Sequence, residues 1–361
     1  EDGIRDVAVT GVQTCALPIW ICGGAVWGDV NNDGLPDLFL TNFNAPNRLY
    51  INQGNGRFVP SRQPLLEKGP RPSYNAWFFD YDNDGWLDLF VATFDQNINH
   101  MILGREGKPH PGDHQRLFRN KGNGIFEDVT ERVGLNRPVM AMGGNFGDVD
   151  NSGYPSIFLG TGGHSLGDIV PNIFYLNQGG RRFVDVSVPG GFSNLQNGHA
   201  VSFTDLDNDG QPDILISLGG AYDSDRFFPQ FLHNPGFPHH WVTIRLWPSA
   251  PHTNTLAIGA RVRAVIDEGG TERSVYATCG KGATFGANSL QVHLGLGRAE
   301  RIKLLEIRWP GDPVLQVFHD VKVDRFYRAV QGKFRLEPLN LRRLSFPKEE
   351  KVHHHEGISS R

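Results

Sequence analysis

Short apolar runs alternate with segments rich in Asp, Asn and Gly through the first two thirds of the chain. Runs such as AWFF (76–79) and LFVATF (89–94) hold aromatic and β-branched residues and are bounded by Asn, Asp or Gly. This pattern is typical of short β-strands. Segment 240–331 contains several runs in which apolar and polar residues alternate, such as WVTIRLW (241–247), with Gly, Pro and Asp between the runs. Such alternation predicts antiparallel strands with one buried face.

A nine-residue polar motif recurs four times, each time between two of these apolar runs. It has Asp at the first position, oxygen-bearing side chains at the third and fifth, Gly at the sixth and usually Asp at the ninth. The copies, here called the first to fourth loops, are 29–37, 80–88, 148–156 and 205–213. Alternate oxygen ligands suit Ca²⁺, which takes six to eight oxygens at about 2.3–2.6 Å. The opening resembles an EF-hand loop, but the twelfth positions are apolar and the flanks are strand-like instead of helical.

We predict side-chain ligands at positions one, three, five and nine, and a backbone carbonyl ligand at position seven. The candidate calcium ligands are Asp29, Asn31, Asp33, Leu35 and Asp37; Asp80, Asp82, Asp84, Trp86 and Asp88; and Asp205, Asp207, Asp209, Gln211 and Asp213. The third loop has Ser at the fifth and ninth positions, so we predict a weak site formed by Asp148, Asp150 and Ser152. The alternative, metal-free Asp/Asn/Gly turns, is disfavoured because carboxylates crowded into nine residues repel one another.

A second repeat follows the first three loops and has the features of a β-hairpin. It combines an apolar pair, an Asn, a Gly-rich turn and a Phe. The copies are 47–60, 115–129 and 172–186. Each unit then contains about four short strands, which is typical of a propeller blade. The units span about 20–60, 70–135, 137–188 and 194–236, and we interpret two Pro-, Gly- and charge-rich stretches, 60–74 and 95–114, as loops at one rim.

Loop and hairpin in this repeating order resemble the FG-GAP/VCBS family of calcium-loop β-propellers over residues 20–236. That resemblance implies a propeller, usually of seven blades, of which four are visible. After it, AIGARV (257–262), VHLGLG (292–297) and EIRWPG (306–311) resemble the ASPIC/UnbV domain, which we place at 237–331. The combination resembles the cartilage acidic protein-like and UnbV-like family. We therefore predict an all-β fold: a partial β-propeller of four blade-like units with a C-terminal antiparallel β-sandwich-like domain.

The two ends of the chain are excluded from this fold prediction. Residues 9–19 resemble the conceptual translation of a sequencing-library adapter, so we interpret 1–19 as non-native. On that interpretation the protein is N-terminally truncated, with its true start and any secretory signal lost upstream. Residues 332–361 lose the alternating pattern and are predicted to be a disordered tail.

Charge, hydropathy and short motifs argue against several classes of function. The net charge of −4 predicts no nucleic-acid partner, and the sequence has no run of 18 apolar residues that would predict a membrane span. GHSLG (163–167) matches the nucleophile elbow of hydrolases, but Pro171 follows where that motif needs a helix, so Ser165 is not favoured as a nucleophile. His199 and His293 show no partner at a recognisable spacing, and a structural role is favoured for both.

We therefore predict a non-enzymatic calcium-binding protein whose ions are structural and whose rim loops bind a protein or glycan partner. The family resemblance implies an extracytoplasmic or secreted location. The alternative is an enzyme or accessory protein of a biosynthetic pathway, because the UnbV name comes from enediyne antibiotic clusters. The ligand, the oligomeric state and the blade count of the intact protein are not predicted.

Overall fold

A computed structural model of the chain describes residues 22–163, 167–219, 227–280 and 282–346. The adapter-like segment 1–19, Ser165 and the tail beyond residue 346 lie outside these ranges. The described part is all-β, with 44% strand and 4% helix. None of its helices has the length and apolar character needed to cross a membrane.

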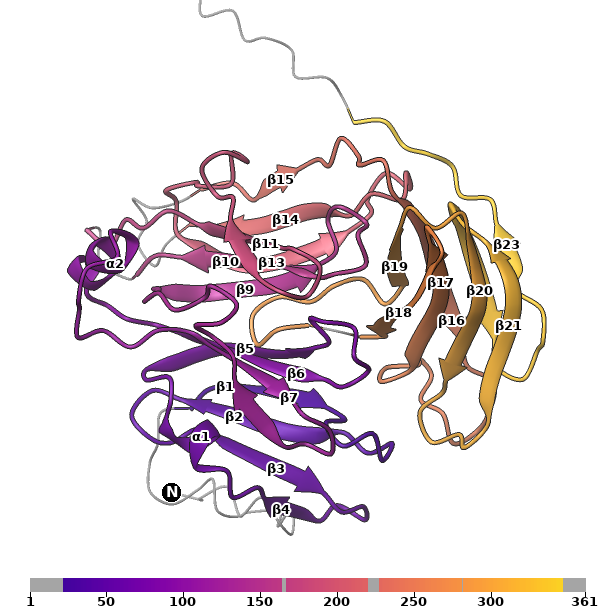
Figure 1. Cartoon of the computed structure of the whole chain (residues 1–361), viewed down its shortest axis with the longest axis horizontal. Helices are drawn as coiled ribbons and strands as arrows, with labels where there is room; N and C mark the ends of the chain where they lie inside the picture. The colour runs from indigo at the N-terminus through magenta and orange to yellow at the C-terminus, as the bar shows by residue number, and fades with distance from the viewer. Residues whose placement is uncertain (1–21, 164–166, 220–226, 281, 347–361) are drawn as a thin grey trace, which may run out of the picture.

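Four small antiparallel sheets are stacked in an arc, and Figure 1 shows the first and fourth at its two ends. The first contains β1 (Cys22–Gly28), β2 (Asp37–Asn42), β3 (Arg48–Asn52) and β4 (Phe58–Pro60). The second contains β5 (Ser73–Phe79), β6 (Asp88–Thr93), β7 (Arg116–Asn120) and β8 (Phe126–Asp128). The third contains β9 (Ala141–Gly147), β10 (Ser156–Thr161), β11 (Ile173–Asn177) and β12 (Phe183–Asp185). The fourth contains β13 (Gly198–Thr204), β14 (Asp213–Leu218) and β15 (Gln230–Leu232).

In each sheet a nine-residue loop joins the first two strands. A hairpin of two further strands follows in the first three sheets, as predicted for a blade, whereas the fourth sheet has three strands instead of four and ends with β15. The first strands β1, β5, β9 and β13 contact one another in sequence along the arc. The strand pairs in these sheets are antiparallel, with register such as Phe79 opposite Asp88 across the second loop. The blade-like prediction is therefore confirmed, as a β-propeller-like array of four sheets.

The apolar runs of the inner second sheet have no polar face because strands β5 and β6 are buried on both sides. Ala76 and Phe78 of β5 face the first sheet, where they pack in one apolar cluster with Phe39. The intervening residues Trp77 and Phe79 face the third sheet and pack with Phe146 and Ile157. Successive side chains of a strand point to opposite faces, so the run AWFF supplies two cores at once. A third cluster, containing Phe158 and Phe203, fills the space between the third and fourth sheets.

The C-terminal part is a sandwich of two four-stranded sheets. One contains β19 (Val292–Gly297), β16 (His240–Trp247), β22 (Arg325–Val330) and β23 (Glu337–Leu339). The other contains β18 (Thr271–Thr278), β17 (Arg261–Glu268), β20 (Arg301–Arg308) and β21 (Leu315–Lys322). Their alternate residues form one core around the buried Trp309. The predicted sandwich is confirmed with one correction, because β16 and β22 pair in parallel.

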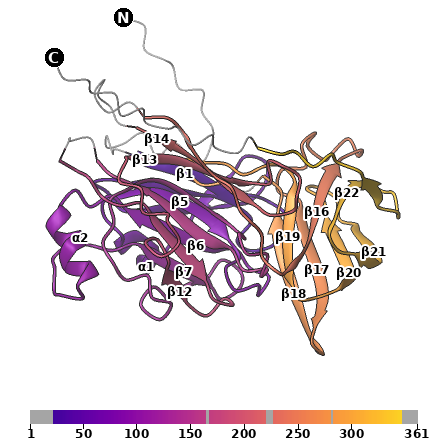
Figure 2. The same ribbon diagram turned by 90° about the horizontal axis from the view of Figure 1, so that it is seen from above.

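The sandwich and the four sheets lie side by side (Figure 2) and are joined by a loop that reaches into the arc. This segment, 282–291 just before β19, is here called the crossing loop, and Figure 1 shows it entering between the second and third sheets. Thr284 N donates to the carbonyl of Ala76 in β5 at 3.1 Å. Phe285 stacks on Tyr74 with ring centroids 4.9 Å apart. Asn288 Nδ2 donates to the carbonyl of Phe146 in β9 at 2.8 Å.

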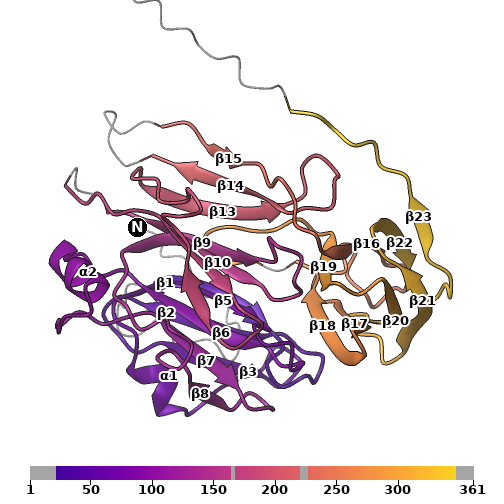
Figure 3. The ribbon, with the colours of Figure 1, turned by 45° about the horizontal axis from the view of Figure 1, so that its top comes forward.

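Two predictions about irregular segments need correction. The stretches 60–74 and 95–114 were predicted as loops, but they contain the short helices α1 (Pro64–Lys68) and α2 (Ile98–Arg105). Pro64 begins α1, and Asn97 caps α2 by accepting the N–H of Asn99, both of which favour a helix start. The disorder predicted from residue 332 is wrong as far as 346, because β23 pairs with β22 and the chain then follows the fourth sheet (Figure 3).

Candidate metal centre

The first residue of each full loop organises the turn through its carboxylate. Asp80 Oδ1 accepts the N–H of Asp84 at 3.1 Å, and its Oδ2 accepts the N–H of Gly85 at 3.0 Å. Asp29 and Asp205 make the same pair of bonds in their loops. The chain bends sharply at Asn83, with φ of 58°, and at Gly85, with φ of 90°. These left-handed conformations favour Asn and Gly, which explains both positions of the motif.

The ninth residue of each loop accepts a hydrogen bond from an Asn at or just after the third strand of its sheet. Asp88 Oδ2 accepts the N–H of Tyr81 at 3.1 Å, and its Oδ1 accepts the N–H of Asn120 at 2.8 Å. Asp37 and Asp213 do the same in the first and fourth sheets. In the third sheet Ser156 Oγ accepts the N–H of Asn177 instead. Each carboxylate oxygen keeps a further lone pair, so this role is compatible with metal ligation.

The fourth residue of every loop is an Asn that links one loop to the next. The Nδ2 groups of Asn32, Asn83 and Asn151 donate to the carbonyls of Gly85, Gly153 and Gly210, the sixth residues of the following loops, at 3.2, 2.8 and 3.0 Å. Asn208 in the fourth loop donates to the carbonyl of Arg342 at 3.0 Å. The segment around Arg342 thus takes the place that a following loop takes elsewhere, and this asparagine chain was not predicted from the sequence.

All four loops lie at one end of the sheets, and the first three and Gly210 of the fourth contact the sandwich. Asn83 Oδ1 accepts the N–H of Tyr276 at 3.0 Å, and Asn151 Oδ1 lies 2.6 Å from His293 Nε2. A Cβ on Gly210 would lie 1.8 Å from the ring of Trp241, so only Gly fits there. The Gly of this motif therefore serves close approach of the two domains as well as the bend.

The structure brings carboxylates together at two of the predicted sites. The ligand atoms of Asp80, Asp82 and Asp88 lie within 4.8 Å of one another, and those of Asp205, Asp207 and Asp213 do likewise. Burial, reinforced by repulsion from neighbouring carboxylates, raises the pKa of Asp80 to about 7 and that of Asp205 to about 6. The anionic forms are thus held in an environment that disfavours uncompensated negative charge.

The first and third loops are arranged differently. Within the described residues, Asp29, Asp33 and Asp37 do not form such a trio, although burial raises the pKa of Asp37 to about 6. In the third loop, Asp148 Oδ2 accepts the N–H of Gly153 at 2.7 Å and Asp150 Oδ1 accepts the N–H of Ser152 at 3.1 Å. With two neutral Ser side chains, this loop is closed by hydrogen bonds between its own atoms.

Arginines from outside the loops supply part of the compensating charge. Arg119 of β7 lies with Nε 2.6 Å from Asp82 Oδ2 and with a terminal nitrogen beside Asp84. Arg261 of β17 lies 3.5 Å from Asp80 Oδ2 and donates to Asn32 Oδ1. Sequence reasoning missed both. Arg119 had a detectable signal, because it directly precedes the Asn of the hairpin repeat, whereas Arg261 had none.

A buried acceptor in the second loop supports cation binding there. Asp82 Oδ1 is buried and, among the described residues, has no hydrogen-bond partner. An orphaned buried carboxylate oxygen is costly unless a cation or donor meets it. The donor set of Asp80, Asp82 and Asp88 is oxygen only, which suits a hard cation such as Ca²⁺. The carbonyl ligands predicted at Leu35, Trp86 and Gln211 stay a prediction.

Two known family models match this chain, one in the region of the four sheets and one in the sandwich. Residues 29–91 match the model of the FG-GAP-like repeat, and residues 250–335 match the model described as ASPIC and UnbV. The chain thus contains an FG-GAP-like repeat and an ASPIC/UnbV domain. The first match covers the first two loops, and the second covers most of the sandwich and the crossing loop.

Curated relatives of this FG-GAP and ASPIC/UnbV chain share one name. It is 24% identical over 300 residues to cartilage acidic protein 1 of Xenopus tropicalis and 23% identical over 296 residues to that of Mus musculus. Each alignment covers 80% of this chain and 41% of the relative, so the chain spans well under half the length of these relatives. A solved structure, a mutant of AofleA from Arthrobotrys oligospora, aligns over 86% of this chain and 75% of its own at 9% identity and a TM-score of 0.32, which is too low to carry an argument.

Proposed function

We propose that this FG-GAP and ASPIC/UnbV chain is a non-enzymatic calcium-binding protein in which the ions are structural. The observation that carries the proposal is the second loop, where the buried carboxylates of Asp80 and Asp88 converge with the partly buried Asp82, whose Oδ1 lacks a partner among the described residues. Asp80, Asp82 and Asp88 would hold the ion there, and Asp205, Asp207 and Asp213 would hold it in the fourth loop. Bound Ca²⁺ would supply the positive charge that offsets their mutual repulsion.

The loops lie where the sheets meet the ASPIC/UnbV domain. The first three loops and Gly210 of the fourth touch the ASPIC/UnbV domain, through contacts such as Asn83 with Tyr276 and Gly210 with Trp241. Carboxylates that repel one another would push these turns open and disturb the contacts. Cation binding by the second and fourth loops is therefore proposed to stabilise the junction of the two domains, and not only the individual sheets.

Calorimetric titration of the metal-depleted protein with Ca²⁺ and Mg²⁺ tests this proposal. We expect Ca²⁺ to bind in preference to Mg²⁺, since Mg²⁺ demands a smaller octahedral shell. At 100 times its Kd, one bound Ca²⁺ should raise the free energy of unfolding by about 2.7 kcal/mol. The variant D80N/D205N should lose most of this gain. Asp320, which is exposed on the ASPIC/UnbV domain and has φ of 50°, provides the control D320N. Absence of Ca²⁺ binding, or a preference for Mg²⁺, would overturn the proposal.

We further propose that the rim opposite the loops binds a protein or glycan partner outside the cytoplasm. Helix α2 and the segment 95–114 lie at this opposite end of the second sheet, away from the ASPIC/UnbV domain (Figure 1). Loops carried by a rigid β scaffold are common sites of recognition. Screening the protein against immobilised glycans and extracellular proteins, with a variant whose segment 98–105 is replaced by Gly and Ser, tests this assignment. Equal binding by both proteins would refute the rim as the binding surface, and cell fractionation tests the location.

A further inference from the structure

A position beside the loops differs in chemistry from one sheet to the next. It is the residue directly before the Asn that lies at or just after the third strand of each sheet. In the four sheets this residue is Ile51, Arg119, Leu176 and His233. In the second sheet the Arg119 guanidinium contacts Asp82 and Asp84, the third and fifth residues of the loop. The outer side of these two carboxylates is therefore a place where a positive charge is stabilised.

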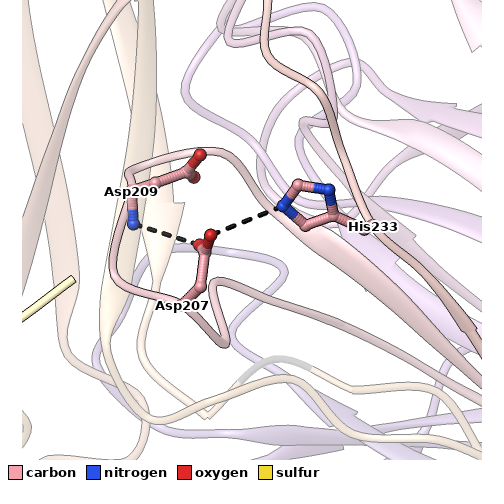
Figure 4. Close-up of side chains that lie close together, drawn as sticks. All are labelled: Asp207, Asp209 and His233. Carbon is pink, nitrogen blue, oxygen red and sulfur yellow. Dashed lines mark hydrogen bonds and ion pairs between the residues drawn. The ribbon is translucent and has the colours of Figure 1, made fainter. Parts of the chain in front are cut away.

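In the fourth sheet the same place holds an imidazole instead of a guanidinium. His233 Nε2 lies 3.4 Å from Asp207 Oδ2, and Figure 4 shows its ring directed at that carboxylate. The ligand atoms of Asp207, Asp209 and His233 all lie within 4.8 Å of one another. The Asp207 and Asp209 side chains are only 5% and 6% exposed, whereas His233 is 44% exposed. Two buried carboxylates and one accessible nitrogen donor thus face a common point.

A positive group of the chain itself already lies at this point. Arg343, from the segment that replaces a following loop, lies 2.7 Å from Asp209 Oδ2, and its side chain is 69% exposed. Backbone contacts hold the segment, since Leu344 N donates to the carbonyl of Asp207 at 2.7 Å. Phe346 packs against His233 with ring centroids 5.6 Å apart. Whereas Arg119 is fixed within a strand, Arg343 is an exposed side chain that can move away.

We propose that Asp207, Asp209 and His233 form a second cation site, specific for a divalent transition metal of the Zn²⁺ class, on the outer side of the fourth loop. A nitrogen ligand beside two carboxylates favours Zn²⁺ over Ca²⁺, which prefers oxygen ligands alone. Asp207 also belongs to the oxygen-only trio with Asp205 and Asp213, so its carboxylate would bridge the two sites. The proposal shares Asp207 with the proposed calcium site and does not otherwise depend on it.

The observed geometry needs little change to hold the metal. Two ligands of a tetrahedral Zn²⁺ lie about 3.3 Å apart, close to the 3.4 Å between His233 Nε2 and Asp207 Oδ2. Asp209 has to exchange its contact with Arg343 for the metal. Three protein ligands leave the fourth position to water, as in open zinc sites. Metal uptake and the Arg343 contact therefore compete for Asp209.

Calorimetry with Zn²⁺ in a buffer saturated with Ca²⁺ tests the proposal. The histidines at 353–355 are replaced by Gln in every protein, so that the tail does not bind the probe. We expect one Zn²⁺ per chain, bound at least tenfold more weakly by H233R, which places in the fourth sheet the residue of the second. The variant R343A should bind several-fold more tightly, because the competing guanidinium is removed.

A gain-of-site variant and a matched control complete the experiment. R119H introduces the fourth-sheet residue beside Asp82 and Asp84 and should add a second Zn²⁺. His240 lies 2.7 Å from Asp324 and belongs to no group of three potential metal ligands in the described part of the chain. It provides the control H240Q, expected to bind like the parent protein. Unchanged Zn²⁺ binding by H233R, or an unchanged stoichiometry in R119H, would show an adventitious ion only and overturn the proposal. One-for-one displacement of Ca²⁺ by Zn²⁺ would overturn the second site as well. Loss of Ca²⁺ binding with Zn²⁺ binding intact would refute only the calcium proposal.

Discussion

Replacing Asn83 should measure what the asparagine chain contributes to the joint between sheets and domain. Its Nδ2 donates to the carbonyl of Gly153 at 2.8 Å, and its Oδ1 accepts the N–H of Tyr276 at 3.0 Å. A hydrogen bond contributes roughly 0.5–1.5 kcal/mol net, so N83G should lower the free energy of unfolding by roughly 1–3 kcal/mol. N83A should cost about 1 kcal/mol more, because a residue with a Cβ is strained at φ of 58°.

Asn55 provides a matched control with the same backbone conformation. It has φ of 52°, is exposed at the tip of the first hairpin, and has no side-chain hydrogen bond among those described. N55G should therefore be nearly neutral, and N55A should show only the backbone strain of about 1 kcal/mol. Urea unfolding in excess Ca²⁺, followed by tryptophan fluorescence, gives the four values. If N83G destabilises the protein no more than N55G, the asparagine chain does not hold the loops together.

Three further predictions concern the loops and the crossing loop. The double substitution S152D/S156D should add one tightly bound Ca²⁺, counted by calorimetry, and should raise the unfolding temperature only when Ca²⁺ is present. If no ion is added, the number of carboxylates in a loop does not determine how tightly it binds Ca²⁺. In EDTA the free energy of unfolding, measured by urea titration, should fall as the pH rises from 5 to 8. The pKa of Asp80 is about 7 in the folded protein, above its value in the unfolded chain, so the folded state binds more protons in this pH range. A free energy of unfolding that rises over this range would contradict the prediction. F285A should lower the free energy of unfolding by about 1–3 kcal/mol, because the ring loses its burial and its stacking on Tyr74. F334A, at a residue that is 79% exposed, should leave the free energy of unfolding unchanged in the same assay.

Local pattern was enough to predict the blades, because each loop and its hairpin lie within one stretch of sequence. Asp at the first position and Gly at the sixth have their partners inside the nine residues, so their effect is readable from spacing. The continuous run AWFF also predicted a strand, and its two buried faces explain why no polar residue interrupts it. The helices α1 and α2 were missed because each is short and α2 has no buried residue, which leaves little apolar periodicity to detect.

Contacts between distant segments were beyond sequence reasoning. Arg261 reaches the first and second loops from the sandwich, and Arg342 takes the place of a following loop from more than 130 positions away. Neither segment carries a sequence motif from which these contacts could be predicted. The residue before the hairpin Asn is different, because aligning the repeats brings Arg119 and His233 into one column beside acidic loops. Reading that column would have identified the charged positions at two of the four sites.

The crossing loop should hold the two parts of the protein together even if the linker between them is cut. It enters from the sandwich and bonds to strands β5 and β9, far earlier in the chain. A protease cut near residue 237 would therefore leave two pieces that stay associated, and size-exclusion chromatography should still give one peak. Expressing either piece alone would leave strands β5 and β9, or the crossing loop, without these contacts, so co-expression of both halves is the appropriate route to a split form of this protein.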